Sequence, residues 1–193
     1  MGPLSIKSNK KDKKGNRILH KIQCLTMIDP ATGWFEICSI PENEFNSTRV
    51  SQLFNRSWLA RYPRPTRVLS DNGSEFKKHF KALLKEFGIK RKTITPKNPQ
   101  ANSIIERIHG VINNMLRVND LENHDFDPVD PWGDLLANIA WALRSLFHTT
   151  TGATPGQLVF GRDMLFDIKY AADWETIRDH KYKQILKNKY KRE

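Results

Sequence analysis

Three acidic residues stand at points where the chain is expected to pass from one structural element to the next. Asp29 follows an apolar run in LTMIDPATG, Asp71 lies in SDNGSEF, and Glu106 lies in NPQANSIIERIHG. Carboxylate oxygens are the ligands that hard cations such as Mg²⁺ prefer. Two such ions, about 3.5–4 Å apart, can activate a nucleophile and stabilise the leaving oxygen of a phosphodiester. The three acids are therefore candidate metal ligands for phosphodiester chemistry.

Each acid also has an ordinary explanation. Asp29, which precedes a proline, could simply start a turn, and Asp71 in Asp-Asn-Gly could serve a turn or a helix cap. Glu106 could be an exposed helical acid. Taken singly, none of the three short motifs identifies a site, and only their combination favours one.

The elements that would position these acids can be predicted from the spacing of apolar residues. Two apolar runs within residues 18–40 flank Asp29-Pro-Ala-Thr-Gly, which predicts a β-hairpin with Asp29 near its bend. Further along, the pattern predicts three helices, from Asn46 or Ser47 to Tyr62, from Ser74 to Phe87 and at Ile104–Val118. It also predicts two strands, at Arg67–Ser70 and Lys90–Thr95, and a loop at Pro96–Ser103. This order predicts an α/β fold in which helices flank a mixed sheet.

Helical geometry gives an independent check on Glu106. At about 100° per residue, one face of the helix at 104–118 would be apolar, formed by Ile104, Ile105, Ile108, Val111, Ile112, Met115 and Leu116. Glu106 would lie on the opposite face, together with His109, Gly110, Asn113 and Arg117. It would point away from the core contact of its own helix, as a ligand must, although a solvated helix face would have the same pattern.

Composition limits the domain organisation. With 193 residues, 38% of them hydrophobic, the chain can bury one good core and has little room for a second domain. We expect a disordered basic arm at residues 1–17, a catalytic core at 18–172 and a basic tail or helix at 173–193. Within the core, residues 132–147 predict a strongly apolar helix.

Charge and cysteine content restrict the partners and the compartment. The net charge of +11 favours a polyanionic partner such as nucleic acid. The only cysteines, Cys24 and Cys38, cannot build a disulfide scaffold or a four-cysteine zinc site, and the six histidines are scattered. No stretch has the length or apolarity of a membrane span or a signal peptide. We therefore expect a soluble intracellular protein, located in the nucleus.

The motifs together resemble the catalytic core of retroviral and long-terminal-repeat retrotransposon integrases, which are DDE recombinases of ribonuclease H-like fold. The resemblance rests on LTMIDPATGWFE, SDNGSEF and TPKNPQANSIIERIHG and covers residues 18–163. The segment TTGATPGQLVFGR is also similar to the one that closes this core in Ty3/gypsy-type elements.

The resemblance implies a mixed five-stranded sheet and a specific role for each acid. Asp29 would bridge two divalent cations, Mg²⁺ or Mn²⁺, while Asp71 and Glu106 would each hold one of them. The implied reaction is trimming of the 3′ ends of the element DNA, followed by strand transfer into target DNA. The residues expected to contact DNA are Lys90, Arg91, Lys92, Lys97, Asn98, Gln100, Asn102, His109, Asn113 and Arg117.

Other functions stay open at this stage. The zinc-binding module that precedes the core in this family is absent from the sequence, as is any SH3-like module after it. The chain could therefore be a domesticated or truncated integrase-derived DNA-binding protein, or a plain ribonuclease H-like nuclease. A homodimer or higher oligomer is also expected, with Trp132 and Trp141 either at its interface or, as aromatic residues at helical spacing more often are, in the core.

Overall fold

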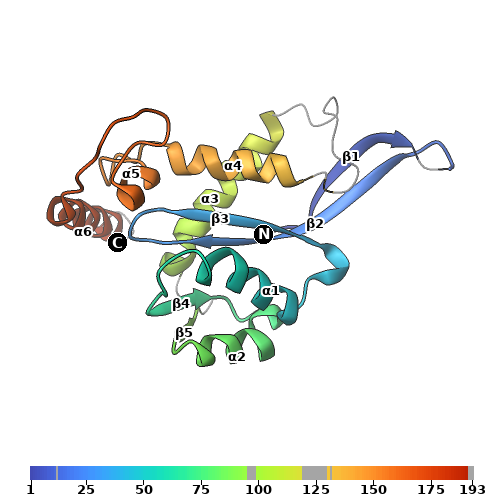
Figure 1. The fold of residues 1–193 in the computed structure, drawn as a ribbon, viewed down its shortest axis with the longest axis horizontal. Helices are drawn as coiled ribbons and strands as arrows, with labels where there is room; N and C mark the ends of the chain where they lie inside the picture. The colour runs from blue at the N-terminus through green and yellow to red at the C-terminus, as the bar shows by residue number, and fades with distance from the viewer. Residues whose placement is uncertain (12, 95–98, 119–129, 131, 191–193) are drawn as a thin grey trace. The chain divides into compact units, whose positions relative to one another are not determined.

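The computed structural model describes residues 1–11, 13–94, 99–118, 130 and 132–190. The chain divides into two compact units. Unit 1 consists of residues 1–27 and 36–137, and unit 2 consists of residues 28–35 and 138–193. Figure 1 labels the helices and strands of both units.

Three of the five strands found among the described residues form one sheet in the order β1-β2-β3: β1 is Leu4–Lys11, β2 is Arg17–Ile28 and β3 is Phe35–Pro41. The hairpin predicted around Asp29 is thus confirmed as β2 and β3. The disordered arm is wrong for residues 4–11, because β1 pairs antiparallel with β2, with Leu4 opposite Ile22. Backbone pairing with the long neighbouring strand β2 stabilises β1, although the lysine-rich sequence of β1 does not predict a strand.

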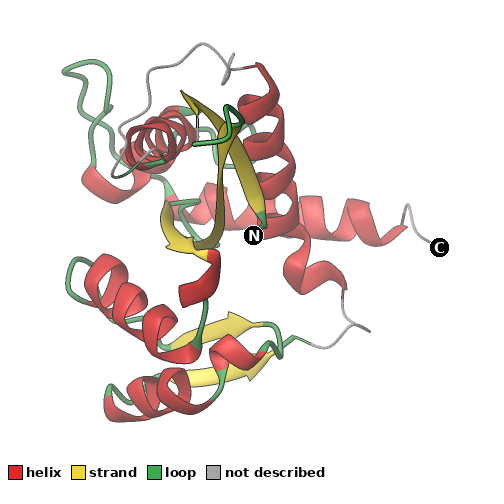
Figure 2. Ribbon diagram, turned by 90° about the vertical axis from the view of Figure 1, so that its right-hand side faces the viewer, coloured by secondary structure: helices red, strands yellow, loops and turns green. Residues whose placement is uncertain are grey.

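The other two strands, β4 (Arg67–Ser70) and β5 (Lys90–Thr93), form a parallel pair, with Ser70 opposite Thr93. The five strands are therefore mixed in direction, as predicted. Hydrogen bonds nevertheless divide them into sheets of three and two strands rather than one sheet of five. Figure 2 shows β4 and β5 side by side, each ending in a loop.

Two helices pack beside this strand pair in unit 1. Helix α1 (Ser47–Phe54) starts at Asn46, whose side chain caps the Arg49 backbone N–H, and continues as a π-helix, η2 (Asn55–Leu59). Helix α2 (Lys78–Glu86) is preceded by a separate 3-10 turn, η3 (Ser74–Phe76), so the single helix predicted from Ser74 is wrong in its first turn. Phe80 anchors α2, because its buried ring contacts the rings of Phe54 and Phe76 edge-on.

Helix α3 (Pro99–Val118) carries Glu106. It begins five residues earlier than predicted, so Pro99–Ser103 belongs to the helix and not to a loop, with a proline at its first position. Ile112 and Leu116 are buried as expected, whereas Ile104, placed on the predicted apolar face, is 40% exposed. A short 3-10 turn, η1 (Glu42–Glu44), follows β3.

Unit 2 consists of the turn between β2 and β3 and the C-terminal helices of the chain. Its helices are α5 (Pro155–Phe160), α6 (Trp174–Tyr190) and the second half of α4 (Gly133–Ser145). Leu158 of α5 and Ile177 of α6 share one buried cluster with Ala153, so the C-terminal segment is a packed helix rather than a frayed tail (Figure 1). No described helix is both long and apolar enough to cross a membrane.

The turn itself is held by aromatic packing within unit 2. The Trp34 ring lies edge-on to Phe160, at 5.1 Å between centroids, and under the Arg144 guanidinium at 4.6 Å. Gly33 has a φ of +80°, a conformation that side chains other than glycine rarely adopt. The position of the turn relative to α5 is therefore determined by several independent contacts.

Candidate metal and nucleic-acid site

Asp71 lies at the carboxyl end of β4 in unit 1. Its Oδ1 accepts a hydrogen bond from the Gly73 backbone N–H at 2.9 Å, which stabilises a tight turn directly after the strand. The side chain is exposed, and the described part of the chain offers no hydrogen-bond partner to Oδ2. One oxygen thus orients the carboxylate, and the other is accessible to a cation.

Arg91 of β5 holds this turn from the neighbouring strand. Its Nε donates to the Ser70 hydroxyl at 3.0 Å, and its Nη2 donates to the Asp71 carbonyl at 2.9 Å. Sequence reasoning assigned Arg91 to DNA. The structure shows that its guanidinium contacts the carboxyl end of β4, so Arg91 helps to position Asp71.

Glu106 is exposed on α3, in agreement with the helical-wheel prediction. His109, one turn later, was placed on the same exposed face, but the structure shows it half-buried against β2. Its Nε2 lies 2.9 Å from the Thr26 hydroxyl. This contact joins the Glu106-bearing turn of α3 to β2, and no sequence pattern had indicated Thr26.

Asp71 and His109, which lies on the Glu106-bearing turn of α3, both interact electrostatically with the Met1 amino group of unit 1. The Met1 backbone is paired with Cys24 of β2, with Met1 N donating to the Cys24 carbonyl at 2.8 Å. Burial lowers the pKa of the Met1 amino group, and the Asp71 and Glu75 carboxylates oppose this shift. The same amino group adds to the lowering of the His109 pKa. The Met1 amino group therefore lies near both Asp71 and His109.

Asp29 has different surroundings. Its Oδ1 accepts from the Ala31 N–H at 3.1 Å, and its Oδ2 accepts from the Thr32 N–H at 3.0 Å and the Thr32 hydroxyl at 2.6 Å. In unit 2, Lys181 of α6 donates to the Pro30 carbonyl at 2.9 Å and also to the Ala31 carbonyl. Burial lowers the Lys181 pKa, and the Asp29 carboxylate opposes this shift. These contacts show that Asp29 stabilises the turn, and its role as a metal ligand stays a prediction.

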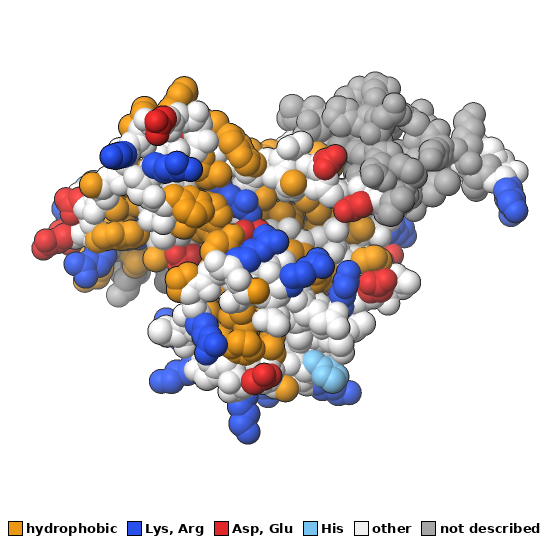
Figure 3. Space-filling view, in the orientation of Figure 1, with side chains coloured by type: hydrophobic (Ala, Val, Ile, Leu, Met, Phe, Trp, Pro, Cys, Tyr) orange, Lys and Arg blue, Asp and Glu red, His pale blue; other side chains and the backbone are white. Residues whose placement is uncertain are grey.

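The other predicted DNA contacts fall into two groups. Lys90 and Lys92 of β5 and Asn113 of α3 are exposed, as a DNA-contacting side chain must be. The remaining side chains lie outside the described residues: Lys97, Asn98, Gln100, Asn102 and Arg117. Figure 3 shows Lys and Arg side chains spread over the face in view, among hydrophobic ones.

The available ligands suit magnesium better than zinc. Across the described residues, no group of three or more His, Cys, Asp or Glu side chains could by itself hold a metal ion. Mg²⁺ usually keeps several waters and needs only one or two carboxylates together with substrate phosphates. Asp71 and Glu106, with exposed carboxylates in one unit, fit that requirement.

The Thr26–His109 contact should make the stability of unit 1 depend on pH. Burial lowers the pKa of His109 below its ordinary value of 6.5, so the folded state favours the neutral ring. The free energy of unfolding that the neutral His109 ring contributes is fully present above pH 6.5. It is lost as the pH falls towards the lowered pKa of His109. His109→Ala should cost about 1 kcal/mol of unfolding free energy at pH 7.5, since one buried hydrogen bond is lost, and less at pH 5.5.

Urea unfolding of both proteins at the two pH values measures this difference. A parent–variant difference that stays constant between pH 7.5 and 5.5 would show that protonation of His109 is not linked to folding.

Comparison with known proteins places this geometry in a family. The sequence profile of the family described as Integrase core domain matches residues 5–99. Together with the relatives described below, this match supports an integrase catalytic core of the retroviral type. The matched stretch begins within β1, which again includes the supposed arm in the core, and it ends before Glu106.

Two curated relatives and two solved structures support the assignment. The integrase core is 26% identical over 141 residues to the Gag-Pol polyprotein of Walleye dermal sarcoma virus and 28% identical over 156 residues to the Pro-Pol polyprotein of Feline foamy virus. These matches cover 72% and 79% of this chain but only 8% and 13% of the relatives.

The structural likeness shows the fold. A chain of the simian T-cell lymphotropic virus intasome, solved in complex with the PP2A regulatory subunit B56γ, superimposes with a TM-score of 0.63 at 18% identity, covering 88% of this chain and 56% of that one. The HTLV-2 integrase catalytic core domain in complex with magnesium, in its trimeric form, gives 0.54 at 19% identity, with 79% and 91% covered. The integrase core thus has the ribonuclease H-like fold expected from its sequence motifs.

Proposed function

We propose that this chain is the catalytic part of a polynucleotidyl transferase that cuts and joins DNA with divalent metal ions, Mg²⁺ or Mn²⁺, bound through Asp71 and Glu106. The observation that carries the proposal is that unit 1 presents two exposed carboxylates, Asp71 directly after β4 and Glu106 on α3, and that the Met1 amino group interacts with both Asp71 and His109 of the Glu106-bearing turn. Membership of the integrase family and the net charge of +11 support DNA as the substrate.

The residues around Asp71 and Glu106 have distinct roles. Gly73 and Arg91 orient Asp71, while Thr26 and His109 fix the turn of α3 that carries Glu106. The exposed ammonium groups of Lys90 and Lys92 would attract DNA phosphates. When bound, a pair of divalent ions supplies charge neutralisation at the entering and leaving oxygens. The full proposal is 3′-end processing followed by strand transfer, in a nuclear homo-oligomer.

For Asp29 we propose the turn role. Both of its oxygens already accept hydrogen bonds from residues 31 and 32, and Lys181 binds the adjacent carbonyls. Its substitution should therefore affect the hairpin more than the chemistry. The bridging role implied by the family resemblance stays a prediction, and the two roles are distinguished by the experiment that closes the Discussion.

The function can be tested on labelled duplex DNA incubated with Mg²⁺, Mn²⁺ or EDTA, with nicked and joined strands separated by denaturing electrophoresis. We expect both product classes with either metal and none in EDTA. Binding of DNA without products in any metal would instead support a domesticated DNA-binding protein. Preferred cutting of an RNA–DNA hybrid would support a ribonuclease H-like nuclease.

A further inference from the structure

Unit 2 contains a hollow that is not lined by any of the candidate metal ligands. It has a volume of about 260 Å³ and lies between the 149–150 turn and helix α6. Six polar side chains line it: Thr149, Thr150, His180, Lys183, Gln184 and Lys187. The C-terminal segment was expected to be a basic tail or helix, and nothing in the sequence connected these two threonines with these lysines.

The lining has the chemistry of an anion site. Two ammonium groups, two hydroxyls and an amide can all donate hydrogen bonds, and no acid lines the hollow. Within the described chain, none of these side chains has a hydrogen-bond or ion-pair partner. The larger hollow of unit 1 differs, because Glu44 and Glu75 line it, and Glu44 lies 3.6 Å from the Arg49 Nε.

Both walls of the hollow are fixed by the fold of unit 2. Residues 180, 183, 184 and 187 follow the i, i+3, i+4, i+7 spacing of one helix face. The helix is anchored by Ile177, which is 4% exposed and clusters with Ala153 and Leu158. The threonine wall is fixed by Thr151, whose hydroxyl donates to the carbonyls of His148 and Ala153 at 3.2 and 3.1 Å.

The charge around the hollow also favours an anion. Lys181, on the same helix, contributes with burial to a lowered pKa at His148, which precedes the two threonines. Lys181 thus lies close to this turn and adds to the positive field of Lys183 and Lys187. The hollow is open to solvent and shallow, which suits a phosphate on a long polymer better than a small enclosed ligand.

We propose that the hollow formed by the 149–150 turn and α6 binds a backbone phosphate of duplex DNA. This inference rests on the proposed function and adds to it a DNA contact surface in unit 2. Because phosphate contacts carry no base information, the surface contributes affinity and orientation without sequence specificity. It would hold DNA independently of Asp71 and Glu106.

The test compares DNA affinity of the parent chain with that of the double variant Lys183→Ala/Lys187→Ala, using a fluorescent duplex in Ca²⁺-free buffer with EDTA at several NaCl concentrations. We expect roughly tenfold weaker binding, since exposed charge contacts are individually modest. The slope of log K against log salt should become shallower by about 2, because two phosphate contacts are lost. Lys183→Arg/Lys187→Arg should retain most of the affinity.

Arg178→Ala/Lys85→Ala is the matched control, because it removes two exposed positive charges outside the hollow and should change affinity and slope less. Unchanged binding by the Lys183/Lys187 double variant overturns the inference and leaves the proposed function standing. Failure of the parent to bind duplex at all overturns both. If inorganic phosphate displaces the duplex far better than NaCl of equal ionic strength, the hollow is a site for free phosphate, and the DNA assignment is wrong.

Discussion

Replacing Asp71 with Asn should reduce metal-dependent DNA cutting about a thousandfold, and Glu106→Gln should have a similar effect. Loss of a metal-binding carboxylate removes several kcal/mol of transition-state stabilisation, and each ~1.4 kcal/mol is a factor of ten in rate. Asn can still accept the Gly73 hydrogen bond through its Oδ1, so the turn should persist. The measurement is the initial rate of strand cutting in Mn²⁺ and in Mg²⁺.

The fold of these variants should be unchanged. Both side chains are exposed, and exposed substitutions usually change stability by no more than about 0.5 kcal/mol. Urea unfolding curves that superimpose on the parent's therefore serve as the control. A variant that folds normally and cuts DNA at more than about a tenth of the parental rate would remove that residue from the metal site.

Phe80→Ala should be the most destabilising of the substitutions discussed, by about 3–5 kcal/mol. The Phe80 ring is 2% exposed and contacts Phe54 of α1 at 5.4 Å and Phe76 of η3 at 5.3 Å, measured between centroids. Its loss leaves a cavity where α1, α2 and the segment after Asp71 meet. Urea-induced unfolding of the parent and the variant measures the difference.

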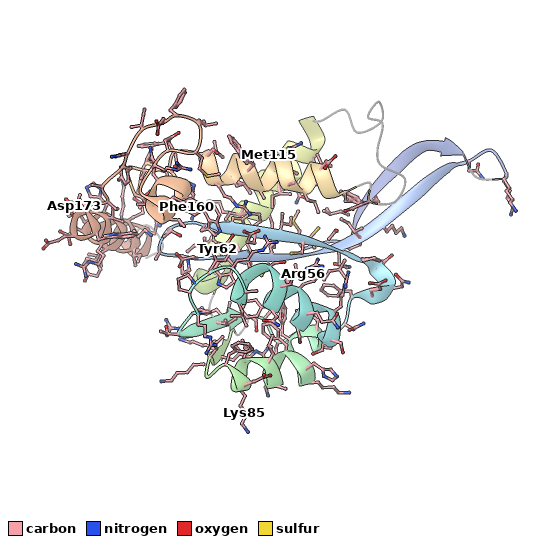
Figure 4. The ribbon with its side chains drawn as sticks, viewed as in Figure 1. Arg56, Tyr62, Lys85, Met115, Phe160 and Asp173 are labelled. Atoms are coloured by element: carbon pink, nitrogen blue, oxygen red, sulfur yellow. The ribbon has the colours of Figure 1, made fainter. Side chains whose placement is uncertain are left out.

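Lys85→Ala is the appropriate control on the same helix. Its side chain is exposed and points away from α2 (Figure 4), so its removal should change the unfolding free energy by less than about 0.5 kcal/mol. If Phe80→Ala cost less than about 1 kcal/mol, α2 would not be anchored by this aromatic cluster.

Local patterns predicted most elements of the fold. Pro and Gly between two apolar runs located the hairpin, and the strand before Asp71 was predicted with its observed bounds, Arg67–Ser70. Strand β1 was missed because its lysine-rich sequence has no apolar alternation, and pairing with β2 provides its stability. Trp132 is buried as expected of an aromatic residue at helical spacing, whereas Trp141 is 43% exposed, which leaves it available for the predicted oligomer contact.

The candidate site was predictable in part. The flanking motifs and helical spacing indicated Asp71 and Glu106, because local geometry determines their exposure. The sequence could not show that Arg91 contacts Asp71 or that His109 contacts Thr26, since these contacts join residues far apart in the chain. For Asp29 the same local pattern fits a turn and a metal ligand equally well, and the hydrogen bonds of the folded turn show the first of these roles without testing the second.

The most direct test of the account compares Asp71→Asn and Asp29→Asn on a branched, labelled DNA that reports strand transfer in reverse, with Mn²⁺ and with EDTA. We expect metal-dependent products for the parent, their loss in Asp71→Asn, and their retention within about tenfold in Asp29→Asn at a temperature where both variants are folded. Products that survive in Asp71→Asn would contradict the assignment of the metal chemistry to Asp71, and products that disappear in a well-folded Asp29→Asn would show that Asp29 is a metal ligand as well as a turn residue.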